Sequence, residues 1–212
     1  MVVLIATTAM LTMGGALMVL TTTETRIAAN YRDGVEAFYA ADAALELVLP
    51  HLYASPDWDA VLSGGARSPF TDGPPNGGRT LQDGAGLNLA DVVNMARCGR
   101  AEACRAAEMG AYSEERPSGP NNPRWTPYAY GRLRELLPAR LDSAAYIVVL
   151  VGDDPFETDD DPLRDGQPGS PGRGALLLRA HAYGPQGVHR MLEAIVSRGE
   201  HGMRVVSQQE LR

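Results

Sequence analysis

A run of acidic residues between positions 153 and 166 is the densest set of side chains in this sequence that could do chemistry. It reads Asp-Asp-Pro-Phe-Glu-Thr-Asp-Asp-Asp-Pro-Leu-Arg-Asp-Gly and contains seven carboxylates. Oxygen ligands at this density suit Ca²⁺, which takes roughly 6–8 of them in proteins. The candidate calcium ligands are Asp153, Asp154, Glu157, Asp159, Asp161 and Asp165.

Two interpretations of this acidic loop stay open. The EF-hand template fails, because a count from Asp161 puts Leu163 at its third position and Gly172 at its twelfth, and neither supplies a carboxylate. The loop is therefore either solvated surface or a calcium site of another kind. Apart from this calcium, the sequence predicts no cofactor.

Cys98 and Cys104 are the only cysteines of the chain. Six residues turn through about 600° on a helix, so the two thiols could not share one helical face, and Gly99 is placed to end a helix between them. In an oxidising compartment the pair favours a disulfide that closes a short loop. Two free thiols are the alternative, whereas a zinc site would need further ligands that the nearby sequence lacks.

The sequence lacks the common catalytic motifs. Its histidines are scattered without a His-Glu-x-x-His pattern, there is no Gly-x-Ser-x-Gly, and a chain without lysine cannot hold a phosphate-binding Gly-Lys loop. We therefore expect no catalysis, and the four histidines are interpreted as surface or strand-face residues: His51, His181, His189 and His201. The net charge of −7 also argues against nucleic acid as a partner, since binding it needs a basic face.

The first stretch of the chain predicts a membrane-spanning helix over residues 1–22. Residues 1–20 carry no charge and no proline, and Glu24 is the first ionisable side chain. About 20 residues at a rise of about 1.5 Å cross a hydrocarbon layer of about 30 Å. A signal peptide fits less well, because the apolar run is too long, lacks a basic start and leads into a continuing helix.

The helical pattern continues as an amphipathic segment over residues 23–54. Apolar residues recur at steps of three and four and fall within roughly 80° of Ile27 on a helical wheel. Glu24 and Asp42 both fall about 60° from Ile27, on the flank of this stripe, where a carboxylate is costly unless it is paired. The residues expected to pack in this helix or in its assemblies are Glu24, Ile27, Tyr31, Val35, Phe38, Asp42 and Leu45.

Two motifs in this helix carry a family resemblance. Residues 21–30 read Thr-Thr-Thr-Glu-Thr-Arg-Ile-Ala-Ala-Asn, Arg32-Asp33 follows, and residues 37–45 read Ala-Phe-Tyr-Ala-Ala-Asp-Ala-Ala-Leu. In this order and spacing they resemble the N-terminal region of the PilX-type minor pilins of type IV pili. Members of that family carry a short basic leader ending in Gly. Because this sequence begins inside the apolar segment, we expect either a misassigned start codon or an omitted leader.

The resemblance implies a structural minor pilin that takes part in pilus assembly, in a priming or tip complex, by helix association without catalysis. Its partners would be other pilin and minor pilin subunits and a tip adhesin. It would sit in the inner membrane with a periplasmic head and then in the pilus at the cell surface. The alternatives are a minor pseudopilin of a type II secretion system and a membrane-anchored periplasmic binding protein or enzyme.

The rest of the chain predicts an α+β, pilin-like head in which the long helix packs on a C-terminal antiparallel sheet. Residues 55–143 are expected to be loop-rich with short helices over 88–97, 101–109 and 133–137, the last ended by Pro138. Residues 144–212 are expected to form the sheet, with strands over 145–151, 176–183, 188–197 and 203–207.

Two details of the head stay open in the sequence. The segment 188–197 also fits a helix, and the Gly-Pro turn before it decides for a strand in a hairpin. Residues 55–79 and 117–127 are expected to be surface loops. Trp125, Tyr128 and Tyr130 are then either an exposed docking patch or a cover over the core.

Overall fold

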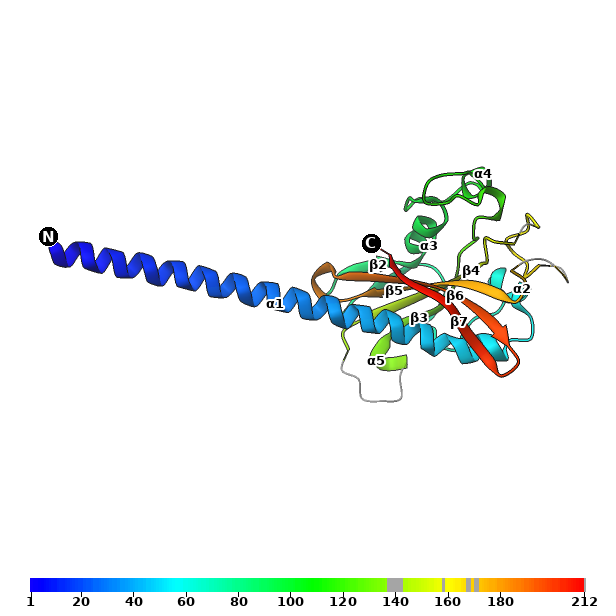
Figure 1. The fold of residues 1–212 in the computed structure, drawn as a ribbon, viewed down its shortest axis with the longest axis horizontal. Coiled ribbons are helices and arrows are strands. Elements are labelled where there is room, and N and C mark those ends of the chain that lie inside the picture. Colours follow the sequence, from blue (N-terminus) through cyan, green and yellow to red (C-terminus); the bar gives the residue numbers. More distant parts are fainter. Residues whose placement is uncertain (137–142, 158, 167–168, 170–171, 212) are drawn as a thin grey trace.

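One long helix, α1 (Val2–Ala54), begins the chain and leads into the head. The computed structural model describes residues 1–136, 143–157, 159–166, 169 and 172–211. The N-terminal part of α1 projects from the head as a rod, and its C-terminal part lies against the sheet (Figure 1). Gly14 and Gly15 do not interrupt the helix, which ends at Ser55 in extended backbone.

The described residues build a five-stranded antiparallel sheet in which each strand pairs with the next one in the sequence. Its strands are β3 (Thr126–Arg132), β4 (Tyr146–Asp153), β5 (Ala175–Tyr183), β6 (His189–Gly199) and β7 (Gly202–Leu211). The hairpin reading of residues 188–197 is confirmed, because β6 pairs with β5 in a continuous register from Tyr183–His189 to Ala175–Ser197. A short 3₁₀ turn, η2 (Pro185–Gly187), joins them.

The structure corrects several predictions about the segment before the sheet. β3 was missed: the loop expected over 117–127 ends as the strand starts, and its aromatic residues are buried in the sheet rather than exposed as a docking patch. The loop expected over 55–79 contains the helix α2 (Trp58–Leu62) and the start of a small hairpin, β1 (Gly78–Thr80) with β2 (Gly86–Asn88).

The short helices are close to their predicted places. Asn88 caps α3 (Leu89–Cys98) as expected, with its side chain accepting a hydrogen bond from the Ala90 amide. The helix expected over 101–109 is shorter, because only α4 (Ala106–Met109) is helical and Arg105 is its N-cap. A 3₁₀ turn, η1 (Gly119–Asn121), precedes β3, and α5 (Leu133–Leu136) follows it, whereas Leu137 and Pro138 lie outside the described residues.

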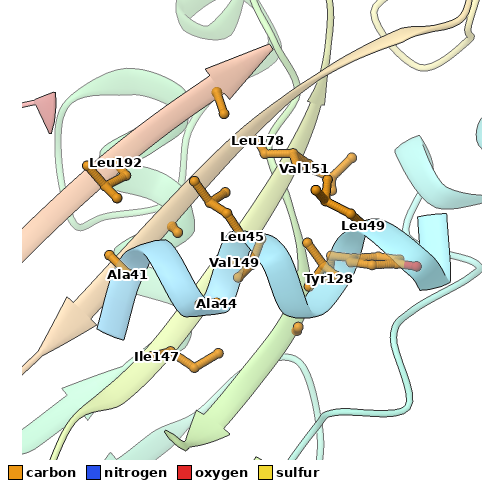
Figure 2. Close-up of a cluster of buried hydrophobic side chains, with 14 of the residues drawn as sticks. Ala41, Ala44, Leu45, Leu49, Tyr128, Ile147, Val149, Val151, Leu178 and Leu192 are labelled. Atoms are coloured by element: carbon orange, nitrogen blue, oxygen red, sulfur yellow. The ribbon is translucent and has the colours of Figure 1, made fainter. Parts of the chain in front are cut away.

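The larger core lies between α1 and one face of the sheet. Ala41, Ala44, Leu45 and Leu49 of α1 face residues of β4, β5 and β6 (Figure 2). The alanines let the helix approach the strands closely, and the branched strand residues fill the space that remains. Ile147, Val149 and Val151 of β4 alternate toward this core, while Val148 and Leu150 face a second cluster under α3.

Candidate functional site

The first part of α1 lies outside the head. Residues 1–32 are exposed, and an 18-residue window of α1 with mean hydropathy 2.0 makes the helix long and apolar enough to cross a membrane. The threonine hydroxyls in this part form hydrogen bonds within the helix. For example, the hydroxyls of Thr7 and Thr8 donate to backbone carbonyls one turn earlier at 2.9–3.0 Å. A hydroxyl paired within its own helix can lie in hydrocarbon, where water is absent.

The face of α1 that packs on the head is rotated away from the middle of its apolar stripe. The buried residues of α1 lie from about −140° to about +40° relative to Ile27. They are Gly34, Ala37, Ala40, Ala41, Ala44, Leu45, Val48, Leu49 and Leu52. Val35 and Tyr39 lie outside this arc, whereas Ile27 and Tyr31 are uncovered because they precede the turns of α1 that contact the head. Together they form an uncovered helix face: Ile27, Tyr31, Val35 and Tyr39 are 63, 75, 37 and 64% exposed.

Both acids that the sequence placed on the flank of the stripe lie along this uncovered helix face. Glu24 is exposed, beyond the part of α1 that packs on the sheet. Asp42 is half-buried, and its Oδ1 accepts a hydrogen bond from Nε2 of Gln208 in β7 at 2.8 Å. Leu45 packs in the core of the head, and Phe38 is half-buried at its margin.

The acidic loop brings together three of the six predicted calcium ligands. Asp153, Glu157 and Asp159 each present a carboxylate oxygen within 4.8 Å of the other two. Asp153 ends β4, Glu157 follows in the loop, and their residues are only 3% and 1% exposed. Asp159 is half-buried beside them.

The other three predicted ligands hold the shape of the loop. Oδ1 of Asp154 accepts a hydrogen bond from the Phe156 amide at 3.1 Å. Asp161 forms an ion pair with Arg164 at 3.3 Å, and Oδ1 of Asp165 accepts from the Gly174 amide at 2.8 Å. These contacts order the chain around the buried cluster.

The buried carboxylates repel one another. Burial raises the pKa of Asp153 to about 9, and the neighbouring charge of Glu157 adds to the shift. Burial also raises the pKa of Glu157 to about 7, with Asp159 and Asp165 contributing. These raised pKa values favour the protonated, uncharged form of Asp153 at neutral pH, so ionising the whole cluster is costly unless something compensates its charge.

Comparison with known families identifies the helical part of the chain. Residues 1–46 match the family model described as PilX N-terminal. The chain carries a PilX N-terminal domain. No curated protein and no solved structure matched the sequence.

The PilX N-terminal domain covers both the exposed part of α1 and its first turns against the sheet. Its last matched residue is Glu46, within the stretch where Ala44, Leu45 and Val48 are buried. A PilX N-terminal domain on a helix that packs against a five-stranded antiparallel sheet is a pilin-like α+β fold, consistent with a PilX-type minor pilin.

Cys98 and Cys104 lie beyond the PilX N-terminal domain and are joined by a disulfide in the structure. α3 ends between them, because Gly99 adopts the left-handed conformation with φ 75°. Nδ2 of Asn94 donates to the Ala101 carbonyl at 2.9 Å and holds the intervening loop against α3. Since both sulfurs are bonded, no thiolate remains for zinc.

Three residues of the acidic loop site were not singled out in the sequence. Asn121 donates from Nδ2 to the Glu157 carbonyl at 2.6 Å, across 36 positions of sequence, and no sequence signal marks that contact. Gly166 and Gly172 lie against the Glu157 side chain. The Asp-Gly and Pro-Gly pairs that contain them indicate turns, but they do not reveal which side chain the turns enclose.

Proposed function

We propose that this protein is a structural minor pilin that acts in type IV pilus assembly, in a priming or tip complex, through helix association and without catalysis. The PilX N-terminal domain supports association with other pilins. The geometry of α1 supports helix association, and the priming or tip role is proposed from the resemblance to PilX-type minor pilins.

The uncovered helix face is the observation that carries this proposal. Ile27, Tyr31 and Tyr39 stay exposed although the same helix buries its small residues against the head. They continue the apolar surface of residues 1–20 without a break in the helix. When subunits bring these surfaces together, each helix can leave the bilayer without exposing apolar side chains to water.

The proposed arrangement assigns each part of α1 a role. Residues 1–22 span the inner membrane before assembly, and residues 23–54 join the helical core of the filament while also holding the head. The assembly surface comprises Glu24, Ile27, Tyr31 and Val35, with Phe38 and Asp42 at its boundary with the head. The apolar helix and the PilX N-terminal domain are consistent with anchoring first and the pilus afterwards.

Deletion of the gene, followed by complementation, tests the proposal. We expect fewer surface pili in the deletion strain, and we expect the complementing protein in sheared pilus fractions. If secretion of folded exoproteins is lost while pili are normal, the protein is instead a minor pseudopilin. If both processes are normal, the proposed function is wrong.

A further inference from the structure

Glu157 is an unusual side chain for a solvated loop. Its residue is 1% exposed, and neither Oε1 nor Oε2 has a hydrogen-bond partner among the residues that the structure describes. Oδ1 of Asp153 is also buried and unpartnered within that part of the chain. A buried carboxylate without hydrogen bonds is rare, and it points to a bound partner.

No cationic side chain compensates the cluster within the described ranges. In the described part of the loop, Asp161 forms an ion pair with Arg164. No described ion pair includes Asp153, Glu157 or Asp159. A buried charge in a native protein is normally paired or bound to a metal. A bound metal ion is the form of compensation that fits this cluster.

At Gly166 and Gly172 the chain passes too close to the Glu157 side chain for any side chain of its own. A Cβ at Gly166 would collide with Glu157 Oε1, and a Cβ at Gly172 would lie 2.6 Å from its Cγ. Both glycines adopt positive φ, at 57° and 91°. The chain is thus shaped closely around this one carboxylate, while Asn121 fixes the main chain of the same residue.

The spacing of the three carboxylates suits Ca²⁺. Ligand oxygens lie about 2.3–2.6 Å from this ion, so two of them on opposite sides are about 5 Å apart. Oxygens of Asp153, Glu157 and Asp159 within 4.8 Å of one another can therefore all contact a single ion. The cluster offers only oxygen donors, which does not suit zinc, and Mg²⁺ demands a tighter octahedron than an irregular loop provides.

We propose that Asp153, Glu157 and Asp159 bind one Ca²⁺, with water completing its coordination. The ion neutralises the buried carboxylates and ties the end of β4 to the loop that follows it. This assignment goes beyond the proposed function and does not depend on it, since a head of any role could hold the site.

Calorimetric titration of the chelator-treated full chain in detergent micelles with CaCl₂ tests the site. We expect one Ca²⁺ per chain and weaker binding of MgCl₂. Glu157→Gln should weaken Ca²⁺ binding by at least about tenfold, because ligand charge tunes the affinity of such sites. Asp160→Asn is the matched control: Asp160 is exposed in the same loop at φ 57°, a conformation that Asn tolerates, so Ca²⁺ binding should be unchanged.

Thermal unfolding separates a lost site from a misfolded variant. At Ca²⁺ a hundredfold above Kd, the Tm of the wild type should rise by about 5–10 °C. In chelator, Glu157→Gln should be at least as stable as the wild type, because it removes a buried charge. The proposal is overturned if millimolar Ca²⁺ neither binds nor raises the Tm, or if Glu157→Gln binds Ca²⁺ as the wild type does. A variant less stable than the wild type in chelator would also overturn it.

Discussion

His181, which is buried, pairs with the exposed His189 on the β5–β6 hairpin. Nδ1 of His181 lies 3.1 Å from Nε2 of His189, and the ring of Tyr183 stacks on His189 at 4.5 Å between centroids. Burial lowers the pKa of His181 to about 3, and the nearby His189 and Arg179 add to this shift. His181 is therefore held in its neutral form, and burial also lowers the pKa of His189, so that one ring donates and the other accepts.

We expect this pair to make the head less stable in acid. The folded pKa of His181 lies below its unfolded value of about 6.5, so the unfolded chain takes up the proton first. The contribution of neutral His181 to the free energy of unfolding is complete above about pH 6.5. It is lost as the pH falls, by up to about 1.4 kcal/mol per pH unit. Urea unfolding from pH 8 to pH 5 measures this, with His181→Asn flattening the dependence and exposed His201→Asn leaving it unchanged. Parallel curves for the wild type and His181→Asn would contradict the assignment.

Glu24 and Asp42 should behave differently although both lie on the flank of one stripe. Asp42 has a partner in its own chain, Gln208, and reaches solvent, so Asp42→Ala should change stability and filament incorporation little. Glu24 lies beyond the head, where we expect a neighbouring subunit to supply its partner and set the register. Glu24→Ala should keep normal membrane levels yet lose incorporation into sheared pili, and unchanged incorporation would refute this.

At the scale of elements, the C-terminal end of α1 is held by a cation from the sheet. Nη2 of Arg198, in β6, donates to the Ser55 carbonyl at 2.7 Å, and its guanidinium lies 4.2 Å from the centroid of the Trp58 ring. Nε1 of Trp58 in turn donates to the Leu52 carbonyl at 3.0 Å. The positive charge suits the carbonyl end of a helix.

Removing this cation should weaken the docking of α1 on the head. We expect Arg198→Met to lower the free energy of unfolding by about 1–2 kcal/mol, through the lost hydrogen bond and cation–π contact. Arg204→Met is the matched control, because Arg204 is exposed in β7 and makes no side-chain hydrogen bond or ion pair among the described residues. Equal denaturant midpoints for the two variants would show that Arg198 contributes nothing.

The Cys98–Cys104 loop should be oxidised in the exported protein. Mass spectrometry of alkylated, unreduced protein should find neither thiol labelled. Replacing both cysteines with serine should lower the free energy of unfolding by about 2 kcal/mol, as expected for a loop this short. Two labelled thiols in freshly isolated protein would end this prediction.

The elements that were predictable are those whose pattern is local. The stripe of α1 is visible because burial of one helix face imposes a period on its residues, and β4 and β5 are visible as continuous apolar runs because both of their faces are buried. β3 was not visible, because Pro127 and Gly131 interrupt it and Thr71 and β4 complete its pairing from elsewhere. The three-residue strands β1 and β2 are too short to show a period.

The candidate site was predictable in composition but not in geometry. The density of carboxylates marked the acidic loop, yet nothing in the sequence separates Asp159 from Asp161, which lie two residues apart. That distinction arises when the loop folds back past Gly166 and Gly172 onto Glu157. Likewise, the apolar stripe of α1 predicted a packing face. Which residues of the stripe the head covers is decided by where the strands of the sheet contact the helix, and the sequence of α1 does not contain that information.

At the scale of the whole molecule, we expect the head to fold without the apolar segment of residues 1–22. The buried residues of α1 begin at Gly34, so the core does not use residues 1–22. A chain in which a cleavable signal peptide replaces residues 1–22 should appear in the soluble periplasmic fraction with a cooperative unfolding transition. A product that stays with the membrane, or that unfolds without cooperativity, would show that the head needs the apolar segment.

The strand order of the sheet determines how far apart in the sequence its pairing partners lie. Because β3 to β7 pair in the order in which they occur in the sequence, each hairpin closes over a short separation and none waits for a crossover. The docking of α1 joins distant parts of the described chain, and so do contacts from the segment before β3, such as the bridge of Thr71 to Tyr130 and the hydrogen bond of Tyr146 to Asp72. A chain threaded across the bilayer from its anchored end would therefore present its strands in assembly order, and the sheet can grow on α1 strand by strand until β7 closes it.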